Sequence, residues 1–278
     1  MPKGHRTYYF ARLSLLGPWQ DRHDFIYSAL TSKVTETRRK FRYGFFDVQD
    51  LKSEEGTFAF GRMVKYKPVL EGEIVDEERR EIVEGGLPLG VVAKPEFLLH
   101  YGTSLVAYRP ISNRLSHRQF RLVYAALIEA AHRDFFVSAD LQPVVEQYKI
   151  LEAIFRFSRI DRISFEIRPT NPSNRDIYRH IDRRLKALNA AKIKETIISE
   201  QGGIDQRELK DDDAFRSLLM ASDGYGFGEV EGEIEGRKAT IATEDTPVQE
   251  EIIATDDPGG LLDQLRASFR RIMSRDGQ

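Results

Sequence analysis

The residues most able to do chemistry form a basic row in the second half of the chain. Its members are spaced at i, i+4, i+8 and i+11, so on a helix they share one face: Arg175, Arg179, Arg183 and Lys186. An apolar row with similar spacing would lie on the opposite face: Ile177, Ile181, Leu185 and Leu188. An outward row of cations suits the phosphates of a polyanion, while the apolar row would dock the helix on a sheet.

Residues beside this helix extend the predicted surface. The strand Ile163–Arg168 comes before a Pro/Asn turn, and Ser173 or Asn174 is expected to cap a helix over 173–188. A strand over Lys192–Ser199 follows the helix. Together these segments predict a nucleic-acid-binding surface, for DNA or RNA, made of Arg168, Arg175, Arg179, Arg183, Lys186, Lys192 and Lys194.

The sequence signals for catalysis are weaker than those for binding. A metal-dependent nuclease needs converging carboxylates beside a lysine, and the two candidate segments are Asp47–Lys52 and Glu208–Lys210. The first places its acids too close together, and the second lies at an expected helix start, where acids are common. The six histidines lack metal-ligand spacing, and there is no Gly-x-Ser-x-Gly elbow. We therefore predict no catalytic residue, metal or cofactor, and keep a nuclease as the alternative.

Two further patterns have a structural and a functional interpretation. The glycines that begin at Gly224 could cradle phosphate, but glutamates alternate with them, which favours a hairpin turned at Glu235-Gly236. Aromatic and basic residues alternate near the start of the chain. Tyr9 and Tyr43 could stack on bases there, or the aromatics could form the core side of a sheet.

Composition limits the class of protein. The chain has 278 residues, no cysteine and no apolar run long enough to span a membrane. The absence of cysteine excludes disulfides, thiolate nucleophiles and iron–sulfur clusters. Arg12 interrupts the first apolar stretch, so we interpret that stretch as a strand and not as a signal peptide. We expect a cytoplasmic protein.

The net charge of −2 conceals strong segregation. Residues 155–194 carry eleven Lys/Arg and four Asp/Glu, whereas residues 195–278 carry nine and twenty. Such segments can neutralise one another within one fold. They can also form a basic surface for phosphate and an acidic C-terminal part that docks a protein partner.

The elements that position these residues predict an α+β fold. Residues 1–112 look like a lobe rich in antiparallel sheet, and residues 113–278 like a mixed α/β lobe that shares its core. The order of elements is compatible with ferredoxin-like sandwiches. Residues 71–86 are acidic and are expected to form a helix or an exposed connection. Ser116 and Gln119 predict a capping box for a helix over 117–133, and a single helix is expected over Glu208–Ala221.

The segment RISFEIRPTNPSNRD, the basic helix and the hairpin that ends in KATIATEDTP carry a family resemblance. Residues 145–255 resemble uncharacterised bacterial proteins of anti-phage defence and mobile-element loci. The resemblance implies a bacterial defence context and carries over no catalytic residue. The leading hypothesis is thus a non-catalytic nucleic-acid-binding or sensing component. A nuclease and a partner-binding scaffold are the alternatives.

Overall fold

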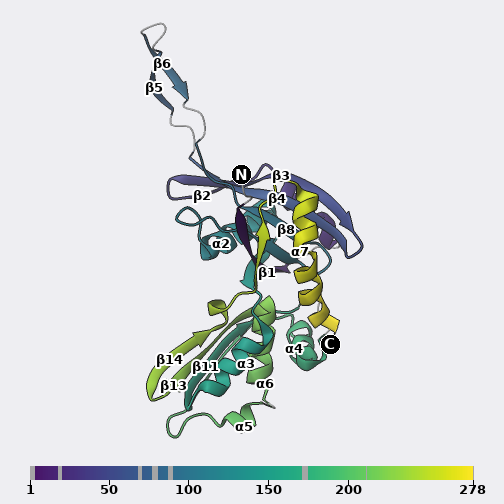
Figure 1. The fold of residues 1–278 in the computed structure, drawn as a ribbon, viewed down its shortest axis with the longest axis vertical. Coiled ribbons are helices and arrows are strands. Elements are labelled where there is room, and N and C mark those ends of the chain that lie inside the picture. Colours follow the sequence, from purple (N-terminus) through teal and green to yellow (C-terminus); the bar gives the residue numbers. More distant parts are fainter. Residues whose placement is uncertain are drawn as a thin grey trace.

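The computed structural model describes residues 4–17, 21–67, 71–76, 81–86, 90–170, 175–210 and 212–277. It contains two larger antiparallel sheets, one above the other along the longest axis of the molecule (Figure 1). Helices and strands are present in similar measure, so the predicted α+β class is confirmed.

The first sheet has nine strands and joins segments from both ends of the chain. Its spatial order is β10 (Ser138–Pro143), β1 (His5–Leu16), β9 (Leu105–Tyr108), β8 (Glu96–His100), β4 (Gly56–Tyr66), β3 (Phe41–Ser53) and β2 (Glu36–Arg38). Two more strands pair with β1 and β4 respectively: β15 (Gln249–Ile253) and β7 (Val91–Ala93). Because β10 and β15 come after residue 112, the later part of the chain completes the sheet begun by the earlier part.

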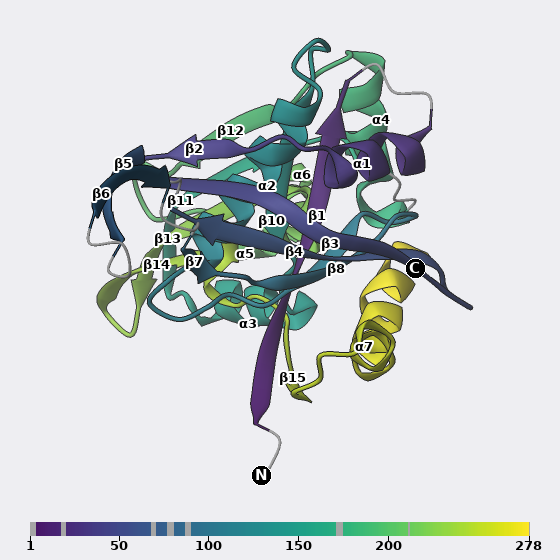
Figure 2. The same ribbon diagram turned by 90° about the horizontal axis from the view of Figure 1, so that it is seen from above.

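Helices cover the first sheet on both faces, because the side chains of a strand alternate between its faces. In β1, Tyr8 and Phe10 pack toward α7 (Pro258–Met273), whereas Leu13 and Leu15 pack in the core beside α1 (Arg22–Thr31) and α2 (His117–Ala131). Figure 2 shows α1 and α7 on opposite sides of the strands. The capping box predicted at the start of α2 is confirmed, with Ser116 and Gln119 each accepting a hydrogen bond from the other's backbone N–H.

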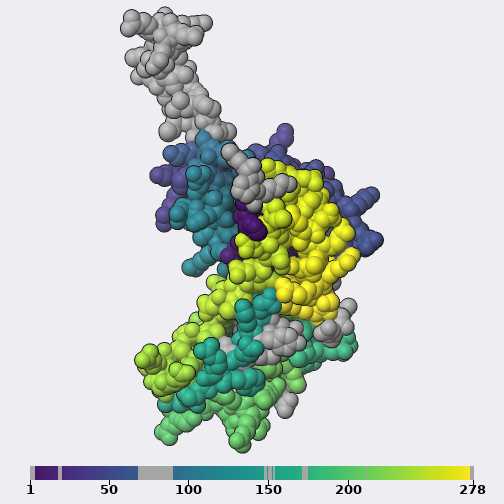
Figure 3. Space-filling view, in the orientation of Figure 1, coloured from purple at the N-terminus to yellow at the C-terminus, as the bar shows by residue number. Residues whose placement is uncertain are grey.

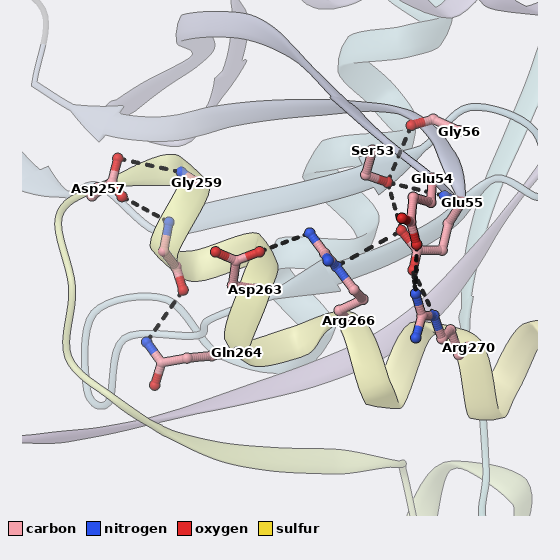
Figure 4. Close-up of polar contacts among 11 residues, drawn as sticks. Ser53, Glu54, Glu55, Gly56, Asp257, Gly259, Asp263, Gln264, Arg266 and Arg270 are labelled. Atoms are coloured by element: carbon pink, nitrogen blue, oxygen red, sulfur yellow. Dashed lines mark hydrogen bonds and ion pairs between the residues drawn. The ribbon is translucent and has the colours of Figure 1, made fainter.

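Ion pairs fasten α7 to the β3–β4 turn (Figure 4). Arg266 Nε lies 3.8 Å from Glu55 Oε2, and Arg270 Nη2 lies 3.4 Å from Glu54 Oε2. The hydrogen bond from Ser53, together with the interaction with Arg270, lowers the pKa of Glu55 to about 2. Glu55 is therefore ionised at neutral pH and available to both arginines.

The second sheet has four strands and is covered by helices on one face. Its spatial order is β12 (Ile193–Ile198), β11 (Arg159–Ile167), β13 (Gly226–Ile234) and β14 (Arg237–Ala242). Its core includes residues of α3 (Gln147–Arg156), α4 (Arg179–Ala187), α5 (Gln206–Leu209) and α6 (Asp213–Met220). The hairpin predicted at Glu235-Gly236 is confirmed, with φ of 52° and 74° at the two turn residues, as a two-residue type I′ turn requires.

Three expectations about local structure are wrong. Residues 71–86 contain β5 (Glu71–Asp76) and β6 (Glu81–Gly86), which pair with each other, so the helix that was one of the two alternatives for this segment is wrong. The helix expected over Glu208–Ala221 is two helices, because Asp212 caps a new start at Ala214 N. The helix expected over 173–188 begins as the 3₁₀ turn η1 (Asp176–Tyr178) and ends at Ala187. Its proposed caps, Ser173 and Asn174, lie outside the described residues.

The remaining short elements connect these parts. The turn η2 (Ala221–Tyr225) joins α6 to β13, η3 (Thr243–Asp245) follows β14, and η4 (Ser274–Gly277) follows α7. Among the described residues, no helix is both long and apolar enough to cross a membrane.

Candidate nucleic-acid interface

Helix α4 presents cations to solvent, as the spacing of its residues predicts. Arg179 and Arg183 are exposed and the Lys186 side chain is half exposed, whereas Ile181 and Leu185 are buried in the core of the second sheet. The helix is therefore amphipathic in the predicted sense.

The ends of the predicted apolar row are not buried. Ile177 is 40% exposed and Leu188 is 64% exposed. Ile177 belongs to η1, whose tighter winding changes its angular position. Leu188 is the C-cap of α4 and lies beyond the last buried residue of the helix, Leu185.

Acidic neighbours neutralise part of the cationic side. Arg179 forms an ion pair with Asp176, and Lys186 Nζ lies 2.6 Å from Asp182 Oδ2. Asp182 is buried and also accepts a hydrogen bond from the backbone N–H of Thr170, so it holds Lys186 firmly. The pair of Arg179 is solvent-exposed, and such pairs contribute only about 0–1 kcal/mol.

Two neighbouring arginines on α4 are more available. Arg183 and Arg184 are both exposed, and neither forms an ion pair with another described residue. Arg184 was not predicted as part of the surface because it lies outside the i, i+4 row. Its position next to Arg183 in a short helix, and not the periodicity, is the signal that identifies it.

Arg175 is not part of the exposed surface, which corrects the prediction. It is 4% exposed and lies before η1 with an extended backbone. Its guanidinium donates a hydrogen bond to Asp223, which also accepts one from the Tyr178 hydroxyl at 3.2 Å. Arg175 therefore holds the start of η1, and with it α4, against η2. The spacing of residues along one helix does not reveal this structural role.

The three predicted residues on the neighbouring strands differ in availability. Arg168 is mostly buried, with Nε 3.0 Å from Asp140 Oδ2. Lys192 is half exposed and its Nζ lies 3.0 Å from Glu166 Oε1. Lys194 is exposed and has no ion pair with the described residues. Lys194 lies directly opposite Glu166 of β11, whereas the alternate residue Ile193 packs in the core that contains α4. Lys194 therefore points away from the helices and does not extend the α4 surface.

Arg175 belongs to a buried network at the junction of the two sheets. Arg12 of β1 is 1% exposed, donates to the carbonyl oxygens of Asp223 and Thr103, and places its guanidinium over the Tyr225 ring. Arg275 donates to the Val145 carbonyl at 2.7 Å. The network joins β1, η1, η2 and η4, segments that are far apart in sequence.

Burial lowers the pKa of two arginines at this junction. It lowers the pKa of Arg22 to about 10, to which the nearby charge of Arg12 contributes. It also lowers the pKa of Arg275, against the attraction of Asp223 and Glu146. The two carboxylates therefore offset part of the cost of burying Arg275.

The glycine-rich segment has a structural role at the same junction. Gly224 in η2 has a φ of 87°, and a Cβ added there would lie 2.7 Å from the Arg12 Cβ and 3.2 Å from the Gln142 carbonyl oxygen. Glycine is therefore required at this position by both conformation and space. The hairpin interpretation of the segment is confirmed.

The predicted nuclease acids do not converge. Asp47 forms an ion pair with Arg62 at 2.8 Å, and Asp50 accepts a hydrogen bond from the Tyr101 hydroxyl at 2.9 Å, both in the first sheet. Glu208 lies on α5 beside the second sheet. These acids therefore cannot share one metal ion.

Only one group of side chains within the described ranges has the spacing of metal ligands. Asp21, His23 and Asp24 at the start of α1 have ligand atoms within 4.8 Å of one another. Asp21 already accepts the capping hydrogen bond of that helix from the Asp24 backbone N–H. The group is largely exposed, and we assign it no function.

The structure separates the two aromatic residues considered for base stacking. Tyr43 is 4% exposed and belongs to the core of the first sheet, so its interpretation as a stacking residue is wrong. Tyr9 is only partly buried and its ring meets His117 edge-on, with 3.8 Å between ring centroids. Tyr9 therefore keeps an accessible aromatic surface.

Comparison with known proteins places the chain in a family. A family model described as "Domain of unknown function (DUF4747)" matches residues 6–271. The chain belongs to the DUF4747 family. No curated protein matches it. The match extends over both sheets and the junction, well beyond the 145–255 segment on which the sequence resemblance rests. The defence context that this resemblance implies stays a prediction.

In this member of the DUF4747 family, β13 carries a row of acids on the face of the second sheet opposite the helices. β13 contributes Glu229, Glu231 and Glu233 to it, and Glu231 and Glu233 pair across to Arg162 and Arg159 on β11. Glu229 has no ion pair with another described residue. Partial burial and the neighbouring Glu231 raise its pKa. Cross-strand ion pairs therefore neutralise Glu231 and Glu233 and leave Glu229 as the acid of this row without a pairing cation among the described residues.

Proposed function

We propose that the protein is a non-catalytic nucleic-acid-binding component that contacts phosphates through the exposed side of α4. The observation that carries this proposal is the pair Arg183 and Arg184, which are exposed neighbours with no carboxylate partner among the described residues. Arginine binds phosphate with charge-assisted hydrogen bonds, and adjacent arginines on one helix can reach successive phosphates.

The acids around Arg179 and Lys186 determine how much each of these cations can contribute to phosphate binding. Arg179 can exchange its exposed pair with Asp176 for a phosphate at little cost. Lys186 is held by buried Asp182, so it contributes less. Such contacts carry no base recognition, and we therefore expect binding that depends weakly on sequence and strongly on salt.

Charge reversal on α4 tests the proposal. We expect Arg183→Glu/Arg184→Glu to weaken binding of a fluorescein-labelled 20-nucleotide strand by about tenfold or more, because two phosphate contacts become repulsive. The slope of log K against log salt should fall by about one for each lost contact. Fluorescence anisotropy at several salt concentrations, with single- and double-stranded DNA and with RNA, measures both quantities.

The matched control is Arg237→Glu/Lys238→Glu, which reverses two adjacent exposed cations on the β13–β14 hairpin. We expect this variant to bind like the unaltered protein. Equal loss in both variants would mean that net charge alone drives binding. Unchanged affinity in the α4 variant would contradict the proposal.

The scattered acids lead to a second expectation, that the protein does not cut nucleic acid. Incubation with Mg²⁺ or Mn²⁺ should leave labelled DNA and RNA intact on a denaturing gel, because two-metal hydrolysis needs carboxylates that converge on two metal ions about 4 Å apart. Cleavage that EDTA stops and that Asp50→Ala or Glu208→Ala abolishes would instead favour the nuclease alternative.

The row of acids on β13, on the face of the second sheet opposite the helices, supports a second candidate function, a scaffold that docks a basic protein partner. Glu229 lies near the centre of that face without a pairing cation in the described part of the chain, and its raised pKa reflects partial burial and repulsion by Glu231. A basic side chain from a partner would relieve this repulsion. If the α4 variant kept full affinity in the titration above, the scaffold would become the better supported function. Under either candidate, a cytoplasmic location and a bacterial defence role are part of the proposal.

A further inference from the structure

Two adjoining cavities open on the first lobe, far in sequence from α4. One has a volume of about 520 Å³ and lies between the start of β1 and the start of α2, and the other has about 620 Å³ and lies beside β7. They share Arg109, Pro110 and Ser112 of the connection that follows β9. In Figure 3 the purple atoms of the first strand lie between the teal and the yellow parts of this surface.

The cavities are cationic. Four permanently charged residues line one or both of them: Arg6, Lys94, Arg109 and Arg114. Among the described residues that line either cavity there is no aspartate or glutamate. Cavity walls of one sign focus the electric field and attract ligands of the opposite sign. The pair of cavities is therefore suited to an anion.

A buried carboxylate behind the cavities positions the arginines. Glu96 is 5% exposed, and its Oε2 lies 3.2 Å from Arg6 Nη1 and 3.7 Å from Arg109 Nη2. The same oxygen accepts a hydrogen bond from the Tyr8 hydroxyl at 2.9 Å, and Oε1 lies 3.7 Å from Arg62 Nη2. One negative charge is thus shared by three guanidinium groups.

Of these three guanidinium groups, Arg109 has the fewest acidic partners to balance its positive charge. Arg6 and Arg62 each have a second, exposed acid, Asp256 at 3.0 Å and Asp47 at 2.8 Å. Arg109 has only the distant Glu96, and its buried Nε–H finds no hydrogen-bond acceptor in the described part of the chain. The fold therefore uses less of the hydrogen-bonding capacity of Arg109 than of the other two guanidinium groups, which leaves Arg109 the most available of the three to an anion at the cavity wall.

The first cavity also offers aromatic rings. Tyr9 and His117 both line it and touch edge-on. Burial, together with the charge of Arg121, lowers the pKa of His117, so its ring is neutral at neutral pH. His117 can therefore contribute a ring or a hydrogen bond there, while the arginines supply the charge.

We propose that these cavities bind a nucleoside phosphate, with the phosphate on Arg109 and the base beside Tyr9. Guanidinium groups recognise phosphate, and a tyrosine face stacks on any base. The nucleotide could be free or the 5′-phosphorylated end of a strand, since both have the same chemistry. The site uses none of the residues of the α4 proposal.

Calorimetric titration of the full chain with AMP, ATP, inorganic phosphate and a 5′-phosphorylated pentanucleotide tests this site. We expect AMP or the pentanucleotide to bind more tightly than inorganic phosphate. Arg109→Gln should weaken that binding about tenfold or more, because a charge-assisted hydrogen bond is lost. Tyr9→Leu should weaken AMP binding and leave phosphate binding unchanged. Tight binding of the pentanucleotide alone would identify a strand end as the ligand, and equal binding of AMP a free nucleotide.

Three further variants keep the result interpretable. Lys94→Gln removes an exposed lining cation that makes no ion pair with the described residues, so it should weaken binding severalfold even if Arg109→Gln proves unstable. Arg118→Gln changes an exposed cation of α2 outside both cavities and should bind normally. Arg183→Glu/Arg184→Glu should keep full affinity for AMP, which separates this site from the α4 proposal. Absence of binding by every probe, or normal binding by both Arg109→Gln and Lys94→Gln, would overturn the proposal.

Discussion

Replacing Asp223 with alanine should destabilise the protein by about 3–5 kcal/mol, since removing one partner of a buried ion pair leaves an uncompensated charge. Asp223 is 1% exposed and accepts hydrogen bonds from Arg175 and Tyr178, while Arg275 Nη1 lies 3.8 Å from it. Its loss would leave two buried guanidinium groups without their shared carboxylate. Urea unfolding at pH 7, followed by circular dichroism, measures the change in the free energy of unfolding.

An exposed acid with two neighbouring nitrogen donors gives the matched control. Asp213 lies 2.7 Å from His180 and 3.1 Å from Arg216 at the surface, so Asp213→Ala should cost no more than about 1 kcal/mol. The double variant Arg175→Met/Asp223→Ala should lose less than the sum of the two single changes, because it removes a pair and not one partner. A cost below about 1 kcal/mol for Asp223→Ala would mean that water reaches the junction and replaces the carboxylate.

The second large effect is expected inside α4. Ile181 is 5% exposed and packs in the core of the second sheet, so Ile181→Ala should cost about 2–4 kcal/mol through the cavity that it leaves. Arg183→Ala, on the exposed side of the same helix, should stay within about 0.5 kcal/mol. The same urea titration measures both values.

The contrast between these two variants tests the polarity on which the α4 proposal depends. If Arg183→Ala were the more damaging change, the arginine would hold the fold together through contacts that compete with phosphate. The nucleic-acid proposal would then lose its main support, and the row of acids on β13 would become the more promising binding surface.

The sequence by itself determined the features that depend on near neighbours. The capping box of Ser116 and Gln119 and the turn at Glu235-Gly236 are confirmed because a few adjacent residues contain all the atoms involved. The buried side of α4 at Ile181 and Leu185 is confirmed for the same reason, since a 3.6-residue period already separates two faces.

Only the tertiary structure decided how distant segments meet. Arg175 looked like the first member of an exposed row, but its partner Asp223 lies 48 residues away in the chain, and their pairing buries both. The strand β10, with the sequence SADLQP, has no alternation strong enough to predict it, yet β1 supplies its hydrogen-bond partners.

The cationic cavities show the same limit. Arg6 and Arg109 come together around Glu96 because β1, β8 and β9 lie side by side in the first sheet, an arrangement that local spacing cannot encode. Periodicity tells which residues share a face of one element. Which faces are covered, and which charges meet, depends on contacts between segments far apart in sequence, and these form only when the whole chain folds.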